Sequence, residues 1–355
     1  RTSGLRDLMD TEHLGVNDAK AALRLVLRGS REVTFDRLPL DRLPLFVRGG
    51  DRTSVLLYEQ LVRSSSGVVV QSAERPYKFM RARRGRAVDA LGFDESQALL
   101  PTGNNVFDGY RLLQEFFAFP ERFMFVELHG LRELMSACKD SKIELILLFD
   151  RADPRLEGVV RASHLSLFCT PAINLFPRTG DRVRLDERDY EYQILPDRTR
   201  PLDYEVHSIT RVAGCGQDGQ ERCEFLPMYA PVWSEDGAQQ RARYALRRQP
   251  RPRVPGRGER ENETRLPYVP SDVYLSLVDG NDDAFSSSLR QVSVDTLCTN
   301  RALPLAVAAG ADERPFSAES QGSVVSVRCV AGPTAPRVSP AFGELSWSFL
   351  SHLSL

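Results

Sequence analysis

The apolar residues of this chain come in short runs, and this limits what the chain can fold into. The longest run is Ile143–Phe149, and Glu144 interrupts it. A helix that spans a membrane needs about 20 apolar residues, so the sequence predicts none. Short apolar runs bounded by turn residues are typical of buried strands. The pattern therefore predicts a β-rich fold.

The composition is that of a globular protein without a strong electrostatic field. Of 355 residues, 42% are hydrophobic and 27% are charged, which excludes a wholly disordered chain. Basic residues number 47 and acidic residues 48, for a net charge of -1. So balanced a chain has no overall attraction to nucleic acid or to an anionic membrane. We expect neither a nucleic-acid partner nor direct membrane insertion.

The cysteines and the N-terminal residues indicate a cytoplasmic protein. Six cysteines are scattered over the chain, with no Cys-x-x-Cys and no histidine at zinc-ligand spacing. Arg1–Asp10 is charged and has no apolar core, unlike a signal peptide. We expect six free thiols, no bound metal and no cofactor.

The order of predicted elements indicates an α+β, multidomain, β-rich protein with short antiparallel strands and a few helices. We expect three domains: a small α/β unit over 1–100, a central β-rich domain over 101–285, and a C-terminal β segment with the start of a terminal helix over 286–355. Helices are predicted over 51–63, 106–119 and 131–139. Strands are predicted over 22–28, 43–47, 68–71, 123–128, 143–149, 164–168, 182–185, 190–194, 204–212, 241–248, 274–278, 292–300 and 324–330.

The helix predicted over 106–119 is the most distinctive segment. Asn104 or Asn105 can cap its start, and Pro120 ends it. Large apolar side chains surround the helix, so we expect burial on more than one side, with a partner groove as the alternative. The side chains assigned to the core are Tyr110, Leu113, Phe116, Phe117 and Phe119.

The run Trp347–Leu355 is rich in apolar residues and has no stop signal. Its spacing fits a helix better than a strand, and we expect Trp347 and Leu350 to dock on the rest of the chain. We expect the chain to be a fragment of a longer protein. The side chains assigned to a partner interface are Trp347, Phe349, His352, Leu353 and Leu355.

Motifs that carry chemistry are weak in this chain. Gly214–Gly219 matches Gly-x-Gly-x-x-Gly, but no helical pattern follows it, so a hairpin tip is predicted in place of a dinucleotide site. Asp181–Asp203 is rich in carboxylates interleaved with arginines, and no spacing selects a catalytic pair. The Arg-rich stretch within 247–270 is predicted to be an exposed linker. We expect no enzymatic activity, with a carboxylate-dependent hydrolase as the alternative.

Six segments in order resemble one family. The most specific is Gly109–Phe123 (GYRLLQEFFAFPERF), followed by Cys169–Phe176 (CTPAINLF) and Pro196–Val206 (PDRTRPLDYEV). Asp272–Asp279, Leu297–Arg301 and Ser351–Leu355 also match. Together they resemble TssF, a baseplate component of bacterial type VI secretion systems.

The resemblance implies a structural role without catalytic residues. It implies a wedge built with TssG, TssK and TssE around the VgrG spike, with two TssF copies per TssG, that supports sheath polymerisation. It further implies a cytoplasmic location, docked at the inner membrane through the secretion membrane complex. A wedge protein of a phage-like contractile particle is the alternative within the same class.

Overall fold

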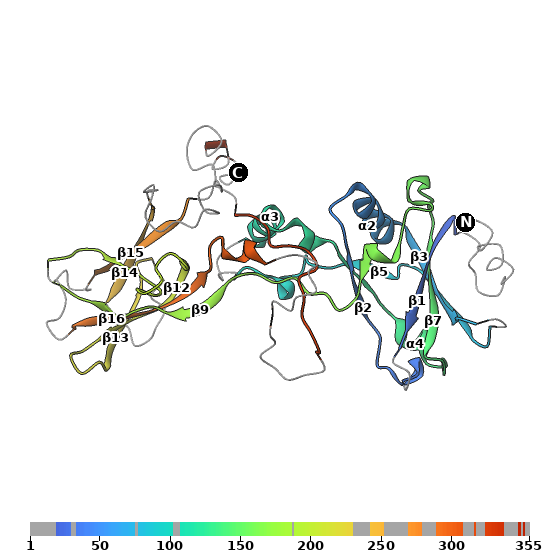
Figure 1. The fold of residues 1–355 in the computed structure, drawn as a ribbon, viewed down its shortest axis with the longest axis horizontal. Coiled ribbons are helices and arrows are strands. Elements are labelled where there is room, and N and C mark those ends of the chain that lie inside the picture. The colour runs from blue at the N-terminus through green and yellow to red at the C-terminus, as the bar shows by residue number, and fades with distance from the viewer. Residues whose placement is uncertain are drawn as a thin grey trace. The chain divides into compact units, whose positions relative to one another are not determined.

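The computed structural model describes residues 19–29, 33–74, 77–101, 107–186, 188–229, 242–251, 269–278, 289–307, 316, 324–336, 347–348 and 351. The chain divides into two compact units, Arg1–Ala172 and Ile173–Leu355. Antiparallel strand pairs dominate the sheets of both units, and the two longest described helices lie in the first unit (Figure 1). The expected α+β, β-rich class is confirmed.

The first unit contains two four-stranded antiparallel sheets, ordered β1-β7-β3-β4 and β5-β6-β2-β8 (Figure 1). Their strands are β1 (Ala21–Arg28), β2 (Leu43–Val47), β3 (Ser65–Ser72), β4 (Met80–Arg84), β5 (Val88–Ala90), β6 (Phe125–Leu128), β7 (Lys142–Phe149) and β8 (Leu165–Ser166). In the described part of this unit the α-helices are α2 (Arg52–Ser64), α3 (Asp108–Ala118) and α4 (Leu131–Met135). All three helices were predicted from the sequence.

Strand β7 explains the longest apolar run of the sequence. It lies between β1 and β3, and side chains on both of its faces are buried. Ile143 and Leu147 belong to the main core cluster, while Ile146 belongs to a smaller cluster on the other face. The interrupting Glu144 is 8% exposed and accepts a 2.8 Å hydrogen bond from Gln71 Nε2. A buried carboxylate needs such a partner, because an unpaired one is costly.

The structure divides the chain at a different point from the two boundaries predicted from the sequence, because strands that are distant in the sequence pair with each other. Strand β1 pairs with β7 along its length, with Ala21 opposite Phe149. A division at residue 100 would separate these two strands, and the structure divides the chain at 172/173. A division at 285/286 would likewise remove β16 from its partner β12. Both expected boundaries are corrected, because strand pairing need not be local in sequence.

The second unit is built on an eight-stranded sheet. Seven strands follow the order β10-β16-β12-β13-β14-β15-β11, and β9 also pairs with β16. The strands are β9 (Phe176–Thr179), β10 (Val183–Arg184), β11 (Tyr192–Gln193), β12 (Glu205–Cys215), β13 (Glu221–Pro227), β14 (Arg243–Pro250), β15 (Ser271–Val278) and β16 (Gln291–Thr299). Val183 of β10 and Tyr192 of β11 share one core cluster, so the sheet folds back on itself.

The glycine-rich motif is a hairpin tip, as predicted. It joins the antiparallel strands β12 and β13. Gly219 has φ +75, a conformation that favours glycine, and its N–H donates to the Gly216 carbonyl at 3.0 Å. No helix opens after the motif, so the amides do not form a phosphate site of the dinucleotide type.

Some strands were missed and one was overestimated. Strands β4, β5, β9 and β13 are short or carry charged and proline residues, which hides their alternation. The strand expected over 324–330 is reduced to a single bridge between Phe316 and Val327. Strand β14 extends to Pro250, so the Arg-rich stretch begins inside a strand, and 252–268 lie outside the described residues. The longest helix among the described residues, α2, has 13 residues, and none of the described helices could span a membrane.

Two cysteines can report on the cores of the two units. Cys138 lies in the core of the first unit and Cys298 in that of the second, and both are 0% exposed. Burial raises the pKa of both thiols, so little reactive thiolate forms at neutral pH. We expect iodoacetamide to label the partly exposed Cys329 in the native protein, and Cys138 and Cys298 only when urea unfolds their units. Mass spectrometry of labelled peptides measures this, and native labelling of Cys138 as fast as that of Cys329 would contradict it.

Candidate interaction surface

Helix α3 buries its polar face. Arg111 and Glu115, one helical turn apart, are 3% and 2% exposed, and Arg122 of the following turn is 1% exposed. Glu115 Oε2 lies 2.6 Å from Arg122 Nε and 3.4 Å from Arg111 Nη1. We call these three residues the ionic core of α3. Charged side chains are rarely buried so fully, and they remain so only when paired.

The ionic core fixes the loop that precedes the helix. Glu115 Oε1 accepts hydrogen bonds from the backbone N–H groups of Leu99 and Leu100, at 2.9 and 3.0 Å. Arg122 donates to the carbonyls of Gly92 and Gln97. Gly92 has φ +102, and a Cβ there would lie 2.7 Å from Arg122 Nη1. A glycine is therefore required where the loop passes the guanidinium.

Arg111 also holds the first turn of α3. Its Nε and Nη2 atoms contact the two carboxylate oxygens of Asp108 at 2.6 and 2.9 Å, in the forked geometry that arginine favours. This pair lowers the pKa of Asp108 and raises that of Arg111. Burial lowers the pKa of Arg122, and the charge of Glu115 opposes that effect. Both guanidinium groups remain charged at neutral pH.

The apolar face of α3 is exposed, and the predicted aromatic core is wrong for three of its five members. Leu113, Phe116 and Phe117 are 51%, 50% and 61% exposed, while Tyr110 and Phe119 are half-buried. The prediction assumed that many apolar side chains around a helix mean burial on several sides. In this unit the buried side is polar instead, because the two arginines are balanced by the two carboxylates of Glu115 and Asp108.

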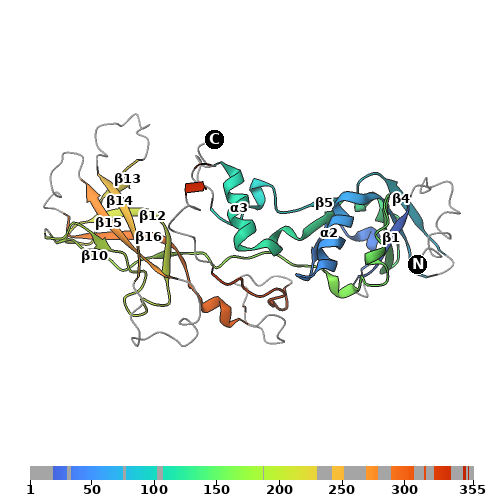
Figure 2. The same ribbon diagram turned by 90° about the horizontal axis from the view of Figure 1, so that it is seen from above.

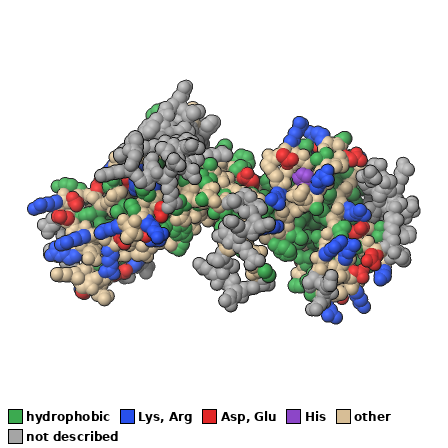
Figure 3. All heavy atoms as spheres, viewed as in Figure 1, with side chains coloured by type: hydrophobic (Ala, Val, Ile, Leu, Met, Phe, Trp, Pro, Cys, Tyr) green, Lys and Arg blue, Asp and Glu red, His purple; other side chains and the backbone are tan. Residues whose placement is uncertain are grey.

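Further aromatic side chains extend this surface beyond the helix. Phe107, the residue before α3, is 72% exposed, and Phe93 in the preceding loop is 51% exposed. The Phe123 ring joins them, with centroids 5.1 Å from Phe93 and 6.0 Å from Phe116. We define the aromatic surface as the five exposed side chains Phe93, Phe107, Leu113, Phe116 and Phe117. Figure 2 shows the position of α3, and Figure 3 shows hydrophobic side chains at the surface in its region.

The charges beside the aromatic surface are acidic. Asp94 and Glu95 directly follow Phe93. Asp108 directly follows Phe107, but its charge is compensated by Arg111. Hydrogen bonds from Ser96 lower the pKa of Asp94, which keeps this carboxylate ionised at neutral pH. Between residues 91 and 123 the basic residues are Arg111 and Arg122, and both are buried. The aromatic surface therefore faces solvent with a negative rim.

The terminal run is only partly described. Trp347, Ser348 and Ser351 are helical, in line with the predicted helix, but Trp347 is 73% exposed. The prediction that Trp347 docks on the body of the chain is therefore wrong. The other predicted interface residues lie outside the described residues, as does Leu350. They are Phe349, His352, Leu353 and Leu355.

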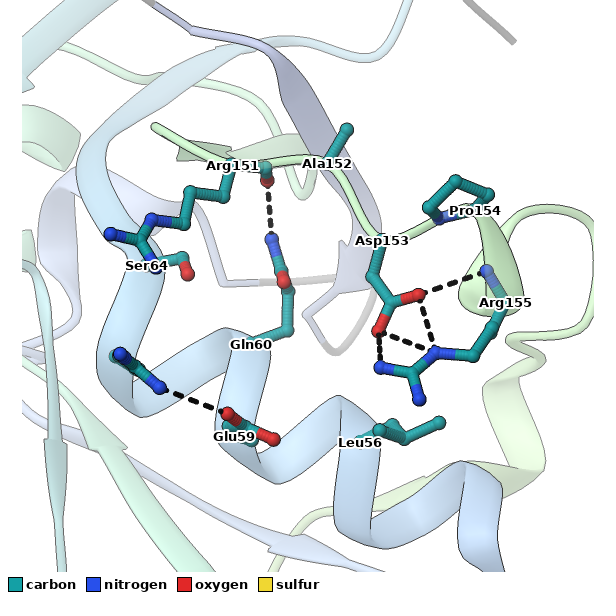
Figure 4. Close-up of a pocket in the computed structure, with 10 residues that line it drawn as sticks. Leu56, Glu59, Gln60, Ser64, Arg151, Ala152, Asp153, Pro154 and Arg155 are labelled. Atoms are coloured by element: carbon teal, nitrogen blue, oxygen red, sulfur yellow. Dashed lines mark hydrogen bonds and ion pairs between the residues drawn. The ribbon is translucent and has the colours of Figure 1, made fainter.

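A pocket of about 480 Å³ lies between α2 and the segment that follows β7 (Figure 4). Its two carboxylates are already paired: Glu59 lies 3.3 Å from Arg63, and Asp153 lies 2.7 Å from Arg155. Gln60 Nε2 donates to the Arg151 carbonyl at 2.6 Å. A carboxylate-dependent hydrolase needs two carboxylates that can act on a substrate, whereas each carboxylate of this pocket lies against an arginine.

The carboxylate-rich segment 181–203 forms turns and ion pairs. Asp197 pairs with Arg178 at 2.7 Å, Glu191 pairs with Arg247, and Asp181 accepts from the Arg198 backbone N–H at 2.7 Å. Figure 3 shows acidic and basic side chains side by side on this unit. None of these carboxylates lines the pocket of Figure 4. Among the described residues, no group of three or more His, Cys, Asp or Glu is arranged to hold a metal ion.

Comparison with known proteins gives consistent matches along the chain. The family model for the type VI secretion system protein TssF matches residues 6–355. The type VI secretion system component TssF1 of Pseudomonas aeruginosa is 43% identical over 337 residues, which cover 95% of this chain and 54% of that protein. The chain therefore spans about half the length of this curated relative.

A solved structure has the same fold. It is a TssK–TssF–TssG baseplate subcomplex of the type VI secretion system, determined by cryo-electron microscopy. The match has a TM-score of 0.66 at 22% identity, and it covers 94% of this chain and 57% of the matched chain. The agreement supports the arrangement of strands and helices described above.

Helix α3 buries charged side chains and exposes apolar ones, an arrangement that we call its inverted polarity. Substitutions on its two faces should therefore change stability by different amounts. We expect Glu115→Ala to destabilise the first unit by about 3–5 kcal/mol, because two buried guanidinium groups lose their partner. Phe117→Ala, on the exposed face, should cost less than about 1 kcal/mol. Urea unfolding of the two variants measures both values. A larger loss for Phe117→Ala than for Glu115→Ala would show that the aromatic face, not the ionic core, is the buried one.

Proposed function

The chain belongs to the TssF family of the type VI secretion system, and from this we propose that it is a structural subunit of the secretion baseplate that acts by assembly and not by catalysis. The observation that carries the proposal is the exposed aromatic surface on α3. It lies within Gly109–Phe123, the most specific of the family segments, and in its flanks. Exposed contiguous apolar side chains with a charged rim are typical of protein interfaces.

The proposed occupant of the aromatic surface is TssG. The solved relative is described as a complex with TssK and TssG, and the family resemblance implies that TssF joins TssG directly. Two observations support a protein partner. Aromatic side chains carry much of the binding energy at interfaces. The ionic core holds the rings in place before binding, which lowers the entropy cost of association.

The finer parts of the assembly are proposals of the same kind. We include TssE, the VgrG spike, two TssF copies per TssG and support of sheath polymerisation. The terminal residues Trp347, Phe349, His352, Leu353 and Leu355 form a second proposed contact, to which the exposed Trp347 lends support. The proposed location is cytoplasmic, at the inner membrane through the secretion membrane complex. The proposal excludes a cofactor and a nucleic-acid partner.

A substitution that introduces a charge into the aromatic surface tests the proposed function. We expect Phe117→Glu to weaken binding to purified TssG by at least about tenfold, because an unpaired carboxylate would be buried in the interface. The melting temperature should stay unchanged, since Phe117 is 61% exposed. Tyr190→Glu is the matched control, because Tyr190 is 88% exposed and lies in the second unit.

Isothermal titration calorimetry measures this binding. Equal affinity of wild type and Phe117→Glu would remove α3 from the interface. Loss of TssG binding accompanied by retained TssK binding would locate the contact on TssG, and the reverse result would move it to TssK.

The negative rim of the aromatic surface leads to a separate prediction, about the rate of association with TssG. We expect the double variant Asp94→Lys and Glu95→Lys to associate more slowly with TssG, because rim charges steer the encounter between proteins. Raising the salt concentration should slow the wild type and have less effect on the variant, since salt screens exposed charges. Surface plasmon resonance at several salt concentrations measures both rates. Faster association of the double variant would mean that the partner surface is itself acidic.

A further inference from the structure

Strand β1 ends one sheet of the first unit, and its outer edge pairs with no other described strand. It has eight residues and stands first in the sheet ordered β1-β7-β3-β4, beside β7 (Figure 1). The register with β7 runs from Ala21 to Arg28 without a shift, so no bulge interrupts the strand. A regular edge of this length is a template for a further strand, and proteins usually protect such edges.

The backbone groups that point away from β7 belong to the even-numbered residues of β1. The Gly29 N–H donates to the Ser141 carbonyl at 2.7 Å, and in an antiparallel pair such bonds recur at every second residue. The residues that bond to β7 are therefore Ala21, Leu23, Leu25 and Leu27. The residues whose N–H and C=O groups point outwards are Ala22, Arg24, Val26 and Arg28. No described residue hydrogen-bonds these outward groups.

One face of this edge carries a row of leucines that the fold covers incompletely. Leu23, Leu25 and Leu27 pack against the main core but remain partly exposed. By contrast, Leu145 and Leu147 of the neighbouring β7 are 0% exposed. A strand added beside β1 would cover the leucine row, and burial of apolar surface would favour apolar side chains on that face of it.

The opposite face of the edge is basic. Arg24 is 66% exposed, with its Nη1 atom 3.4 Å from Glu144 Oε1. Arg28 is exposed and lies directly opposite Lys142 in the register. Like charges in directly opposite positions destabilise a sheet, and the described residues give neither of these two side chains an ion pair. Acidic side chains from outside the chain would compensate this charge.

A phosphate group fits this edge less well than a polypeptide does. It accepts hydrogen bonds and donates none, so it has no bond to offer the outward carbonyl groups of β1. A phosphate would also leave the leucine row exposed. An extended polypeptide pairs with the N–H and C=O groups together and presents side chains to both faces, as in other cases of strand addition.

A second copy of this chain offers no matching strand among the described residues. If two copies of β1 paired, no register would bring an acidic residue to either arginine, because β1 contains none. The other described edge strands have five residues or fewer, and the longest of them, β4, carries three arginines. These strands are β4, β5, β8, β9, β10 and β11. A different protein therefore fits the edge better.

We propose that β1 accepts a strand from TssG, with acidic side chains beside Arg24 and Arg28 and apolar side chains over the leucine row. The proposal rests on the proposed function in taking TssG as the partner, because that function already assigns TssG to the first unit. It adds a second contact, made through backbone hydrogen bonds and without α3.

A proline at an outward position tests the added strand. Proline occurs on edge strands where its missing N–H faces solvent, so Val26→Pro removes a hydrogen bond to the added strand and none to β7. We expect this variant to keep the melting temperature of the wild type and to bind purified TssG at least about tenfold more weakly. Val26→Thr keeps the N–H and should keep full affinity. Leu27→Pro removes an N–H that bonds to β7, so it should melt at a lower temperature.

A charge reversal tests the same edge without changing the backbone. We expect Arg28→Glu to weaken TssG binding while the melting temperature stays the same or rises, because the new carboxylate lies opposite Lys142. This variant decides the matter if Val26→Pro fails to fold. Wild-type binding to phosphatidylserine vesicles that Arg28→Glu loses and Val26→Pro keeps, with no effect of either change on TssG, would assign the edge to phosphate groups and overturn the proposal.

Hydrogen exchange of the 355-residue chain, resolved to single amides, reports on the edge directly. The amides of Arg24, Val26 and Arg28 should exchange fast in the free chain and slowly in the complex with TssG. Slow exchange in the free chain would show that the edge is already covered, which overturns the proposal. Full affinity of Val26→Pro and Arg28→Glu, with Phe117→Glu binding lost, would overturn the added strand and leave the proposed function standing. A wild-type chain that does not bind TssG would overturn both.

Discussion

Glu115 is the point on which the candidate site depends. One of its carboxylate oxygens holds two arginines, and the other accepts two backbone N–H groups from the loop before the helix. Removing a partner from such a group leaves buried charge, whereas removing a half-exposed ring removes little. Helix α3 is therefore attached to its unit through charge, and its apolar face points to solvent. The aromatic surface exists because the ionic core occupies the other side.

The sequence predicts the sheets of this protein better than it predicts the site. Strand β7 could be identified because its side chains are buried on both faces and the residues are apolar throughout. Strands that are short or have one solvent-exposed face, such as β4 and β9, do not show a continuous apolar run in the sequence. The unit boundary could not be found because β1 pairs with a strand more than a hundred residues away. Local periodicity carries no information about such pairings.

The site was misread for a related reason. A helical pattern shows which side chains share a face but not which face is buried, and hydrophobic faces are buried in most helices. The sequence did contain a signal that the polar face of α3 is buried, because Arg111 and Glu115 are spaced one turn apart and Arg122 lies in the 3-10 turn that follows the helix. That spacing is also common on solvated surfaces. It would identify the buried face of α3 only together with the glycine at position 92. The loop at Gly92 approaches Arg122 too closely for any side chain, and this approach is visible only in three dimensions.

The inverted polarity of α3 suits a protein that folds first and assembles afterwards. If the aromatic side chains were the ones holding α3 to its unit, a partner could reach them only by pulling the helix away. With the ionic core in that role, the rings are available and their positions are set in advance, so binding need not reorganise the fold. Exposed rings also carry a risk of non-specific association, and the carboxylates of Asp94 and Glu95 oppose it by repelling like surfaces. A partner with basic residues around an apolar patch would satisfy both features at once, whereas a second copy of the same acidic rim would be repelled.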